Sequence, residues 1–181
     1  KLNAEYFSVG NLEVSNNDSM LAYSLDLKGS EYFTIYVRRI TDNKIVSEEI
    51  NETSGSITWS LDDKYIFYSK LDEHHRPRKI YRHKIETSIK NDQLIYEEKD
   101  EGFVCGIDIS SDEKYFLIKT SDNTTSEIYF FDVNETNPKP KLFKKRQKEI
   151  EYSIDSWKGN FYIHTNLDAE DFKICTCKHD N

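Results

Sequence analysis

The chain has 181 residues, with 33 acidic and 25 basic side chains and a formal net charge of −8. This acidic balance disfavours a general nucleic-acid binder, which normally presents a basic face. The charged fraction of 32% is high, but an aromatic fraction of 13% indicates a folded core rather than disorder. No run approaches the roughly 20 consecutive apolar residues of a membrane-spanning helix, so we expect no membrane partner.

The first residues and the cysteines of the chain indicate whether it is part of a longer protein and in which compartment it folds. The sequence shows no signal-peptide pattern, and it begins at Lys1 with Met20 as its single methionine. We therefore expect a segment cut from a longer protein. Three cysteines, an odd number, do not make a disulfide framework. They are typical of a reducing compartment, which predicts the cytoplasm.

Four predicted units follow one another along the chain, and the first three share one order of strands. Each opens with an apolar strand, a turn rich in Ser, Asp and Asn, and a second apolar strand, at 12–23, 57–68 and 107–118. A third strand follows, centred on 35–37, 80–82 and 128–130, and a copy of it ends the fourth unit at 174–176. A short fourth strand completes the first three units, at 44–47, 93–96 and 141–143.

The spacing of the third strands indicates a repeat. They recur at Ile35, Ile80, Ile128 and Ile174, at intervals of 45, 48 and 46 residues. Four strands in about 40–50 residues are typical of a β-propeller blade. We predict an all-β fold, a partial β-propeller of about four four-stranded antiparallel blades, the last incomplete, at 5–50, 55–98, 103–146 and 151–181. The alternative fold is an unrelated β-meander or sandwich whose hairpins are similar by chance. The best candidate for a helix in the sequence is 144–151.

A set of short motifs runs in order along nearly the whole chain. The most specific is Tyr-Glu-Glu-Lys-Asp at 96–100. The others lie at 4–8, 13–15, 22–26, 59–60, 81–83, 125–127, 151–153 and 161–166. Together they resemble the propeller of the oligopeptidase B branch of the prolyl oligopeptidase family of serine peptidases. In that family a seven-bladed propeller covers an α/β-hydrolase domain, and by this resemblance residues 1–181 are early-to-middle blades only.

The resemblance implies a gating role. In the family the propeller restricts the active site to short peptides, and oligopeptidase B-like members cleave after Arg and Lys. We therefore expect a non-catalytic gate whose partners are short basic peptides and an α/β-hydrolase domain missing from this chain. The alternative is a stand-alone propeller that binds other proteins. Because an open array of blades exposes apolar faces and strand edges, we also expect self-association.

The residues themselves predict no catalytic, cofactor or metal site. The nucleophile turn of an α/β-hydrolase reads Gly-Xaa-Ser-Xaa-Gly, and the only glycine pair with that spacing, Gly102 and Gly106, has Val104 at its centre. Cys175 and Cys177 should share one face of a strand. Zinc sites usually space paired cysteines by two to four residues and need a second pair, so we interpret these cysteines and the nearby His179 as small buried side chains or a frayed chain end rather than a metal site.

Three charged segments have a plain interpretation beside a functional one. The loop 74–78 is predicted to be a solvated tip between two strands. The six basic residues within 139–148 are predicted to form a solvated connection rather than a patch for nucleic acid or an acidic partner. The acidic turn, with Glu97, Glu98, Asp100 and Glu101, is interpreted as charge for solubility, and the alternative is attraction of basic peptides.

Overall fold

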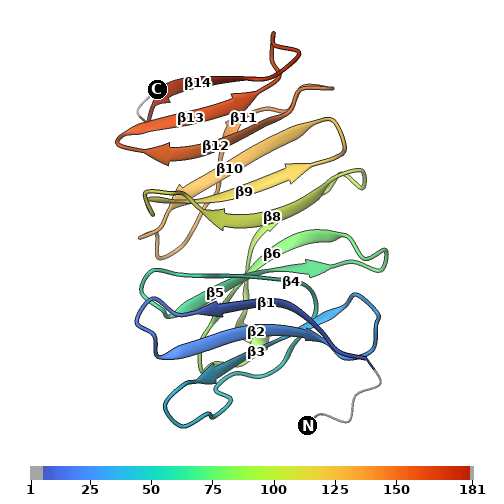
Figure 1. Ribbon diagram of the computed structural model, residues 1–181, viewed down its shortest axis with the longest axis vertical. Helices are drawn as coiled ribbons and strands as arrows, with labels where there is room; N and C mark the ends of the chain where they lie inside the picture. Colours follow the sequence, from blue (N-terminus) through green and yellow to red (C-terminus); the bar gives the residue numbers. More distant parts are fainter. Residues whose placement is uncertain (1–5, 180–181) are drawn as a thin grey trace. The chain divides into compact units, whose positions relative to one another are not determined.

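The structure, a computed structural model, describes residues 6–179 and has fourteen strands there, joined in antiparallel pairs (Figure 1). Its one helical element in these residues is a single 3-10 turn, Ile89–Asn91 (η1). The predicted all-β class is confirmed. The chain divides into two compact units, Lys1–Glu97 and Glu98–Asn181. The motif residues Ala4 and Glu5 and the two C-terminal residues lie outside the described residues.

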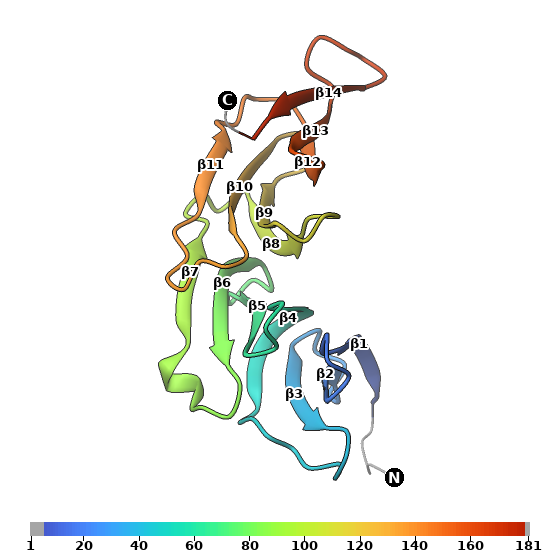
Figure 2. The same cartoon turned by 90° about the vertical axis from the view of Figure 1, so that its left-hand side faces the viewer.

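The first unit is a seven-stranded meander in which the order in space follows the order in sequence, from β1 to β7 (Figure 2). Its strands are β1 Ser8–Val14, β2 Met20–Asp26, β3 Phe33–Arg39, β4 Ile50–Trp59, β5 Tyr65–Leu71, β6 Pro77–Lys84 and β7 Gln93–Glu97. The ten-residue β4 belongs to two pairings. Ile50 and Thr53 pair with β3, and Thr53 and residues 57–59 pair with β5, with a register shift in each pairing.

The prediction of a fourth strand at 44–47 is wrong. This segment makes only an isolated bridge between Ile45 and Arg38, supported by a 2.9 Å hydrogen bond from the Val46 N–H to the Val37 carbonyl. The reason lies in the neighbouring strand β4, which already pairs with β3 at Phe33 and Ile35. Only the last residues of β3 are left for 44–47.

The core of the first unit comes from the apolar runs that predicted its strands. Its buried members are Ala22, Ile35, Val37, Ile50, Ile57, Trp59, Ile66 and Tyr68. In β5 four consecutive residues, 66–69, are buried, as in a strand that is covered on both faces.

The second unit contains two sheets. The four-stranded sheet has the order β11-β10-β9-β8, and the three-stranded sheet has the order β12-β13-β14. Their bounds are β8 Val104–Ile109, β9 Tyr115–Ser121, β10 Ser126–Asp132, β11 Lys141–Lys144, β12 Tyr152–Trp157, β13 Asn160–Thr165 and β14 Lys173–Lys178. The core between them is aromatic, with Phe161 lying 5.3 Å from the rings of Phe130 and Phe143. The four blade ranges stay a prediction.

The helical candidate 144–151 is also wrong. Lys144 ends β11, and the backbone continues irregularly up to Ile150. The Arg146 N–H donates to the Glu127 carboxylate (2.7 Å), and the Lys144 carbonyl accepts a hydrogen bond from the Tyr152 hydroxyl (2.5 Å). These backbone groups are therefore hydrogen-bonded to side chains instead of forming the backbone hydrogen bonds of a helix.

One hydrogen-bonded turn recurs three times, as the sequence repeat suggested. In the second copy the Ser60 hydroxyl donates to Asp62 (2.7 Å) and accepts the Tyr65 N–H (3.0 Å). Ser15 and Ser110 do the same with their own partners two and five residues ahead. Each turn places one residue in the left-handed region, with φ of 56°, 57° and 55° at Asp18, Asp63 and Glu113. The side-chain bonds stabilise this otherwise uncommon conformation.

In residues 6–179 we find no helix of the length and apolar character needed to cross a membrane.

Candidate functional site

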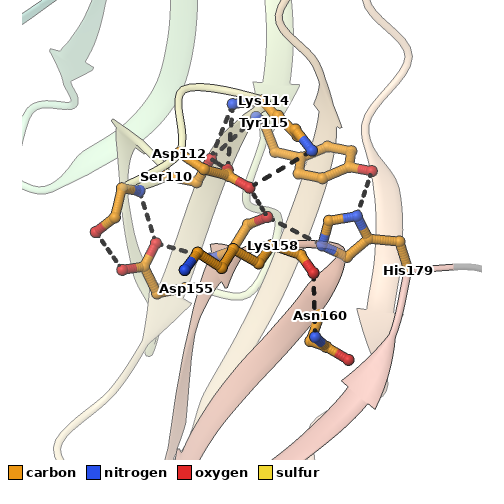
Figure 3. A network of polar contacts seen from close by, with 10 residues as sticks. Ser110, Asp112, Lys114, Tyr115, Asp155, Lys158, Asn160 and His179 are labelled. Carbon is orange, nitrogen blue, oxygen red and sulfur yellow. Dashed lines mark hydrogen bonds and ion pairs between the residues drawn. The ribbon is translucent and has the colours of Figure 1, made fainter.

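A polar network in the second unit joins the β8–β9 turn to β12 and to the residue after β14 (Figure 3). The Ser156 hydroxyl donates to Asp112 (2.9 Å) and lies 3.0 Å from His179 Nε2. Because the single hydroxyl proton goes to the carboxylate, the ring proton of neutral His179 belongs on Nε2. His179 Nδ1 then accepts from the Tyr115 hydroxyl, 3.3 Å away.

This network contains Ser, His and Asp, but its geometry is not that of a nucleophilic triad. In a triad the histidine lies between the acid and the serine, and the acid orients the ring. Here Ser156 lies between Asp112 and His179, and a tyrosine contacts the second ring nitrogen. Ser156 is also fully buried, so it has no access to a substrate. The network stabilises the packing of β14 against the β8–β9 turn.

Sequence reasoning missed the role of His179, which it grouped with the two cysteines. Cys175 and Cys177 do share one face of β14, as expected, because burial alternates along that strand. Cys177 packs on the cluster around Phe161. Among residues 6–179 there is no group of three or more His, Cys, Asp or Glu side chains placed to bind a metal ion.

In both units, carboxylates accept hydrogen bonds that link neighbouring turns and strands. In the second unit Asp155 of β12 accepts hydrogen bonds from the hydroxyl and the backbone N–H of Ser111. Burial alone would raise the pKa of Asp155, but these hydrogen bonds outweigh it and hold the pKa below the usual value. In the first unit Asp63 accepts the N–H groups of Asn16 (2.7 Å) and Asn17 (3.0 Å).

A second charged cluster centres on Arg146. Its Nη2 lies 2.6 Å from Glu98 Oε2 and 2.9 Å from Glu127 Oε2, and its guanidinium carbon lies 3.9 Å from the centre of the Phe103 ring. Glu98 also accepts hydrogen bonds from the Thr120 hydroxyl (2.5 Å) and the N–H of residue 100 (2.9 Å). The cluster thereby ties the two connections that flank the four-stranded sheet, 98–103 and 145–151, to β9 and β10.

This cluster corrects two interpretations of charged segments. Glu98 is buried and ion-paired rather than a solubility charge, and Arg146 is half-buried rather than solvated. The physical reason is their mutual pairing across 48 residues of sequence. The other members of both segments are exposed as predicted, and so are residues 74–76 of the loop between β5 and β6.

The strands β1, β4, β8 and β12 each carry one carboxylate and no basic residue, although the carboxylate of β4 precedes the second predicted unit. Glu13 lies on β1, Glu52 on β4, Asp108 on β8 and Asp155 on β12. Glu13, Glu52 and Asp108 are exposed, and Glu52 pairs with Lys70 at 3.5 Å. Lysine, arginine and histidine are confined to later strands, such as β6 and β14. Sequence reasoning missed this separation of charge, although the signal was present in the strand sequences.

Comparison with known proteins places these features in a family. The family model described as "Prolyl oligopeptidase, N-terminal beta-propeller domain" matches residues 3–181. Protease 2 of Moraxella lacunata is 31% identical over 175 residues, and dipeptidyl aminopeptidase BI of Pseudoxanthomonas mexicana is 29% identical over 182 residues. These matches cover 96% and 98% of this chain and 25% of each relative. The chain thus spans about a quarter of the length of the curated relatives it matches.

Solved structures agree with this result. Oligopeptidase B from Leishmania major matches with a TM-score of 0.93 at 22% identity, covering 98% of this chain and 26% of that one. Oligopeptidase B from Trypanosoma brucei, with covalently bound antipain, matches with a TM-score of 0.90 at 25% identity, covering 98% and 25%. The predicted β-propeller fold is therefore confirmed.

Proposed function

Because the chain belongs to the N-terminal β-propeller domains of the prolyl oligopeptidase family, we propose that it is the gate of an oligopeptidase B-like serine peptidase. In this proposal the propeller admits short peptides and excludes folded proteins, so selection by size precedes the chemistry. The catalytic domain is a separate part of the whole protein. Movement of the propeller against that domain limits turnover, as lid opening does in many enzymes.

The observation that carries the proposal is the separation of charge along the strands. Four-stranded blades surround a central channel in a β-propeller, and we place the first strand of each unit at that channel. Each unit then contributes an exposed carboxylate of its own to the channel of the whole propeller, Glu13 from the first unit and Asp108 from the second, and in this proposal these charges give the channel a negative field. Such a field raises the local concentration of positively charged ligands and speeds their association by about 10- to 1,000-fold. Short peptides that contain Arg or Lys are the substrates it favours.

The test uses the protein in which this chain is joined to a catalytic domain. Glu13→Gln combined with Asp108→Asn removes two exposed carboxylates that make no ion pair within residues 6–179. We expect kcat/KM for a short Arg-containing peptide to fall several-fold in low salt, and the difference to shrink near 1 M salt, where the Debye length is about 3 Å. A length-matched uncharged peptide should be cleaved as before.

The matched control is Glu101→Gln, which removes an exposed charge from the turn before β8 rather than from a first strand. If both variants change kcat/KM equally, or if the charged and uncharged peptides respond alike, the proposed channel does not select by charge. Separately, residues 1–181 alone should release no product from the same peptide. Hydrolysis by this segment contradicts a purely gating role.

A further inference from the structure

The outer strands of the first unit carry a polar groove of about 260 Å³ that the proposed gating function does not use. The lining residues lie on β5, β6, β7 and the segment between β6 and β7, and they are Tyr65, Arg82, Lys84, Thr87, Asn91 and Gln93. The groove is therefore built from strands other than β4, the strand that we place at the channel. Each molecule of liquid water takes about 30 Å³, so the groove has room for a small ion and for atoms attached to it.

Arg82 is held in one position at this groove. Its Nη2 donates to the side-chain carbonyl of Gln93 (2.6 Å), and its guanidinium carbon lies 4.3 Å from the centre of the Tyr65 ring. An arginine that is stacked on a ring and hydrogen-bonded at one edge loses little further freedom when a ligand binds. The guanidinium charge is therefore preorganised at the groove.

Lys84 and Asn91 bring further donors to the groove. Both side chains are exposed. Among residues 6–179, Lys84 makes no ion pair and the side-chain amide of Asn91 makes no hydrogen bond. An ammonium carries three N–H donors and an amide carries two. These donors are therefore available to a ligand that accepts hydrogen bonds.

The two carboxylates in the segment that lines the groove are engaged elsewhere. Glu86 lies 2.7 Å from Nη2 of Arg39, and Asp92 lies 2.7 Å from Nδ1 of His83. No aspartate or glutamate of the described residues lines the groove itself. In a chain with a net charge of −8, the charge of Lys84 is thus left to attract an anion.

We propose that this groove binds the phosphate group of a small phosphate compound. A guanidinium and an ammonium together attract a dianion more strongly than a single negative charge, and the arginine fork matches the geometry of phosphate oxygens. The donors come from β6 and from the segment before β7, so they reach the ligand from more than one direction. A tetrahedral group can accept hydrogen bonds from all of them, whereas the two oxygens of a carboxylate lie in one plane.

Acetylation of Lys84 provides a local measure of occupancy. The protein is treated with N-succinimidyl acetate, and mass spectrometry follows each lysine separately, at constant ionic strength and at a mildly alkaline pH where phosphate is a dianion. We expect inorganic phosphate at about ten times its dissociation constant to slow the acetylation of Lys84 roughly tenfold, because most sites are then occupied. Lys28, an exposed lysine of the same unit outside the groove, is the internal control and should react as before.

Three anions separate the possible ligands. Inorganic phosphate and phenyl phosphate carry the same group, and acetate carries a single charge. Protection of Lys84 by phenyl phosphate at a lower concentration than inorganic phosphate supports the proposal and assigns a phosphate ester. Protection by both at the same concentration supports it and assigns the phosphate group alone. Acetate that protects Lys84 as well as phosphate does overturns the proposal.

Two variants keep the Lys84 reporter and remove the other donors. Arg82→Gln should raise the phosphate concentration for half-protection about tenfold, as expected for a lost hydrogen bond to a charged group. Asn91→Ala should raise it by a smaller factor. Lys79→Gln, which removes a charge from the other end of β6, is the matched control and should keep wild-type protection. Circular dichroism verifies folding, and Asn91→Ala decides the test if Arg82→Gln does not fold.

Two further outcomes overturn the proposal. The first is equal slowing of Lys84 and Lys28, which means that phosphate acts on every exposed lysine alike. The second is unchanged protection in Asn91→Ala and in a folded Arg82→Gln, which means that one exposed lysine attracts the anion without a built site.

Discussion

Arg146 is the residue whose charge balances two buried carboxylates in the second unit. The side chains of Glu98 and Glu127 are each 5% exposed, and both lie within 2.9 Å of Arg146 Nη2. Removing a carboxylate from water costs several kcal/mol, which only close pairing and further hydrogen bonds offset. Tyr129 supplies one such bond, from its hydroxyl to Glu127 (3.0 Å). We therefore expect the Arg146 guanidinium to contribute to the stability of this unit by offsetting the burial of both carboxylates.

We expect Arg146→Met to lower the free energy of unfolding by about 3–5 kcal/mol, the usual cost of leaving buried charges without their partner. The loss should appear in urea unfolding at neutral pH. Lys148→Met, at an exposed site two residues away, is the control and should change stability by less than about 0.5 kcal/mol. Equal stability of the two variants would show that the cluster contributes nothing net.

Glu98 makes the stability of the chain depend on acid pH. Burial alone would raise its pKa, but hydrogen bonds from Thr120, the N–H of residue 100 and Arg146 outweigh burial and hold the pKa below its ordinary value of 4.5. A carboxyl whose pKa is lowered by folding contributes stability above its unfolded pKa and loses it as the pH falls through the folded value.

We therefore expect urea midpoints of the wild-type chain to decline below about pH 4.5. Glu98→Gln should be less stable at pH 7 and show a shallower decline, because the glutamine does not titrate. The two curves should converge towards pH 3. Parallel curves over the whole range would mean that Glu98 titrates with the same pKa in the folded and unfolded chain.

At the scale of elements, an aspartate at the end of η1 joins two strands of the first unit. Asp92 accepts hydrogen bonds from the Tyr68 hydroxyl of β5 (2.8 Å) and from Nδ1 of His83 on β6 (2.7 Å). His83 is fully buried, and its Nε2 has no partner among the described residues. Burial beside this carboxylate raises the pKa of Tyr68, so the tyrosine stays a donor.

Asp92→Asn should lower the free energy of unfolding by about 1–3 kcal/mol, because two buried donors lose a charged acceptor. Urea unfolding measures the loss. Asp42→Asn, in the exposed turn after β3, provides the control, and it should leave the urea midpoint nearly unchanged since its partner Arg39 is solvent-accessible. A cost of the same size at both positions would mean that burial adds nothing to the Asp92 bonds.

The sequence predicted those elements whose cause is local. Apolar runs and Ser/Asp turns marked the strands because a turn such as Ser60–Tyr65 is stabilised by its own side chains. The prediction from sequence failed where pairing with another strand determines whether a segment becomes a strand. The segment 44–47 has a plausible strand composition, but β4 pairs with part of β3 first. The local sequence therefore predicted which segments can form strands. It did not predict which of two segments would pair with β3.

The same distinction applies to the candidate sites. Exposed lysines such as Lys145 and Lys148 were predicted correctly, because charged residues usually remain in water. Arg146 lies between them and has the same local pattern, yet it pairs with Glu98, 48 residues earlier in the chain. Nothing local distinguishes a paired arginine from a solvated one. The charge separation on the first strands was local, and it could have been found by comparing strands within the repeat.

At the scale of the whole molecule, we expect the exposed first strand to govern self-association of the chain. β1 is the terminal strand of the seven-stranded sheet and has a single hydrogen-bonded neighbour, β2. It exposes Val9, Leu12 and Val14 at 49%, 57% and 44%. An unpaired edge that is also apolar is a template for pairing with another chain. Its single charged residue, Glu13, is a weak barrier to such pairing.

We expect residues 1–181 to self-associate as concentration rises, with a mean mass above that of the monomer by light scattering. Leu12→Lys places a charge in the middle of the exposed edge, where lysine opposes edge-to-edge pairing, so it should shift the population towards monomer. Ile45→Lys is the matched control, because Ile45 is 41% exposed but lies outside the strands. If the wild-type chain stays monomeric over a wide concentration range, the edge is not an association site. If both lysine variants dissociate the assembly equally, added net charge rather than the β1 edge controls it.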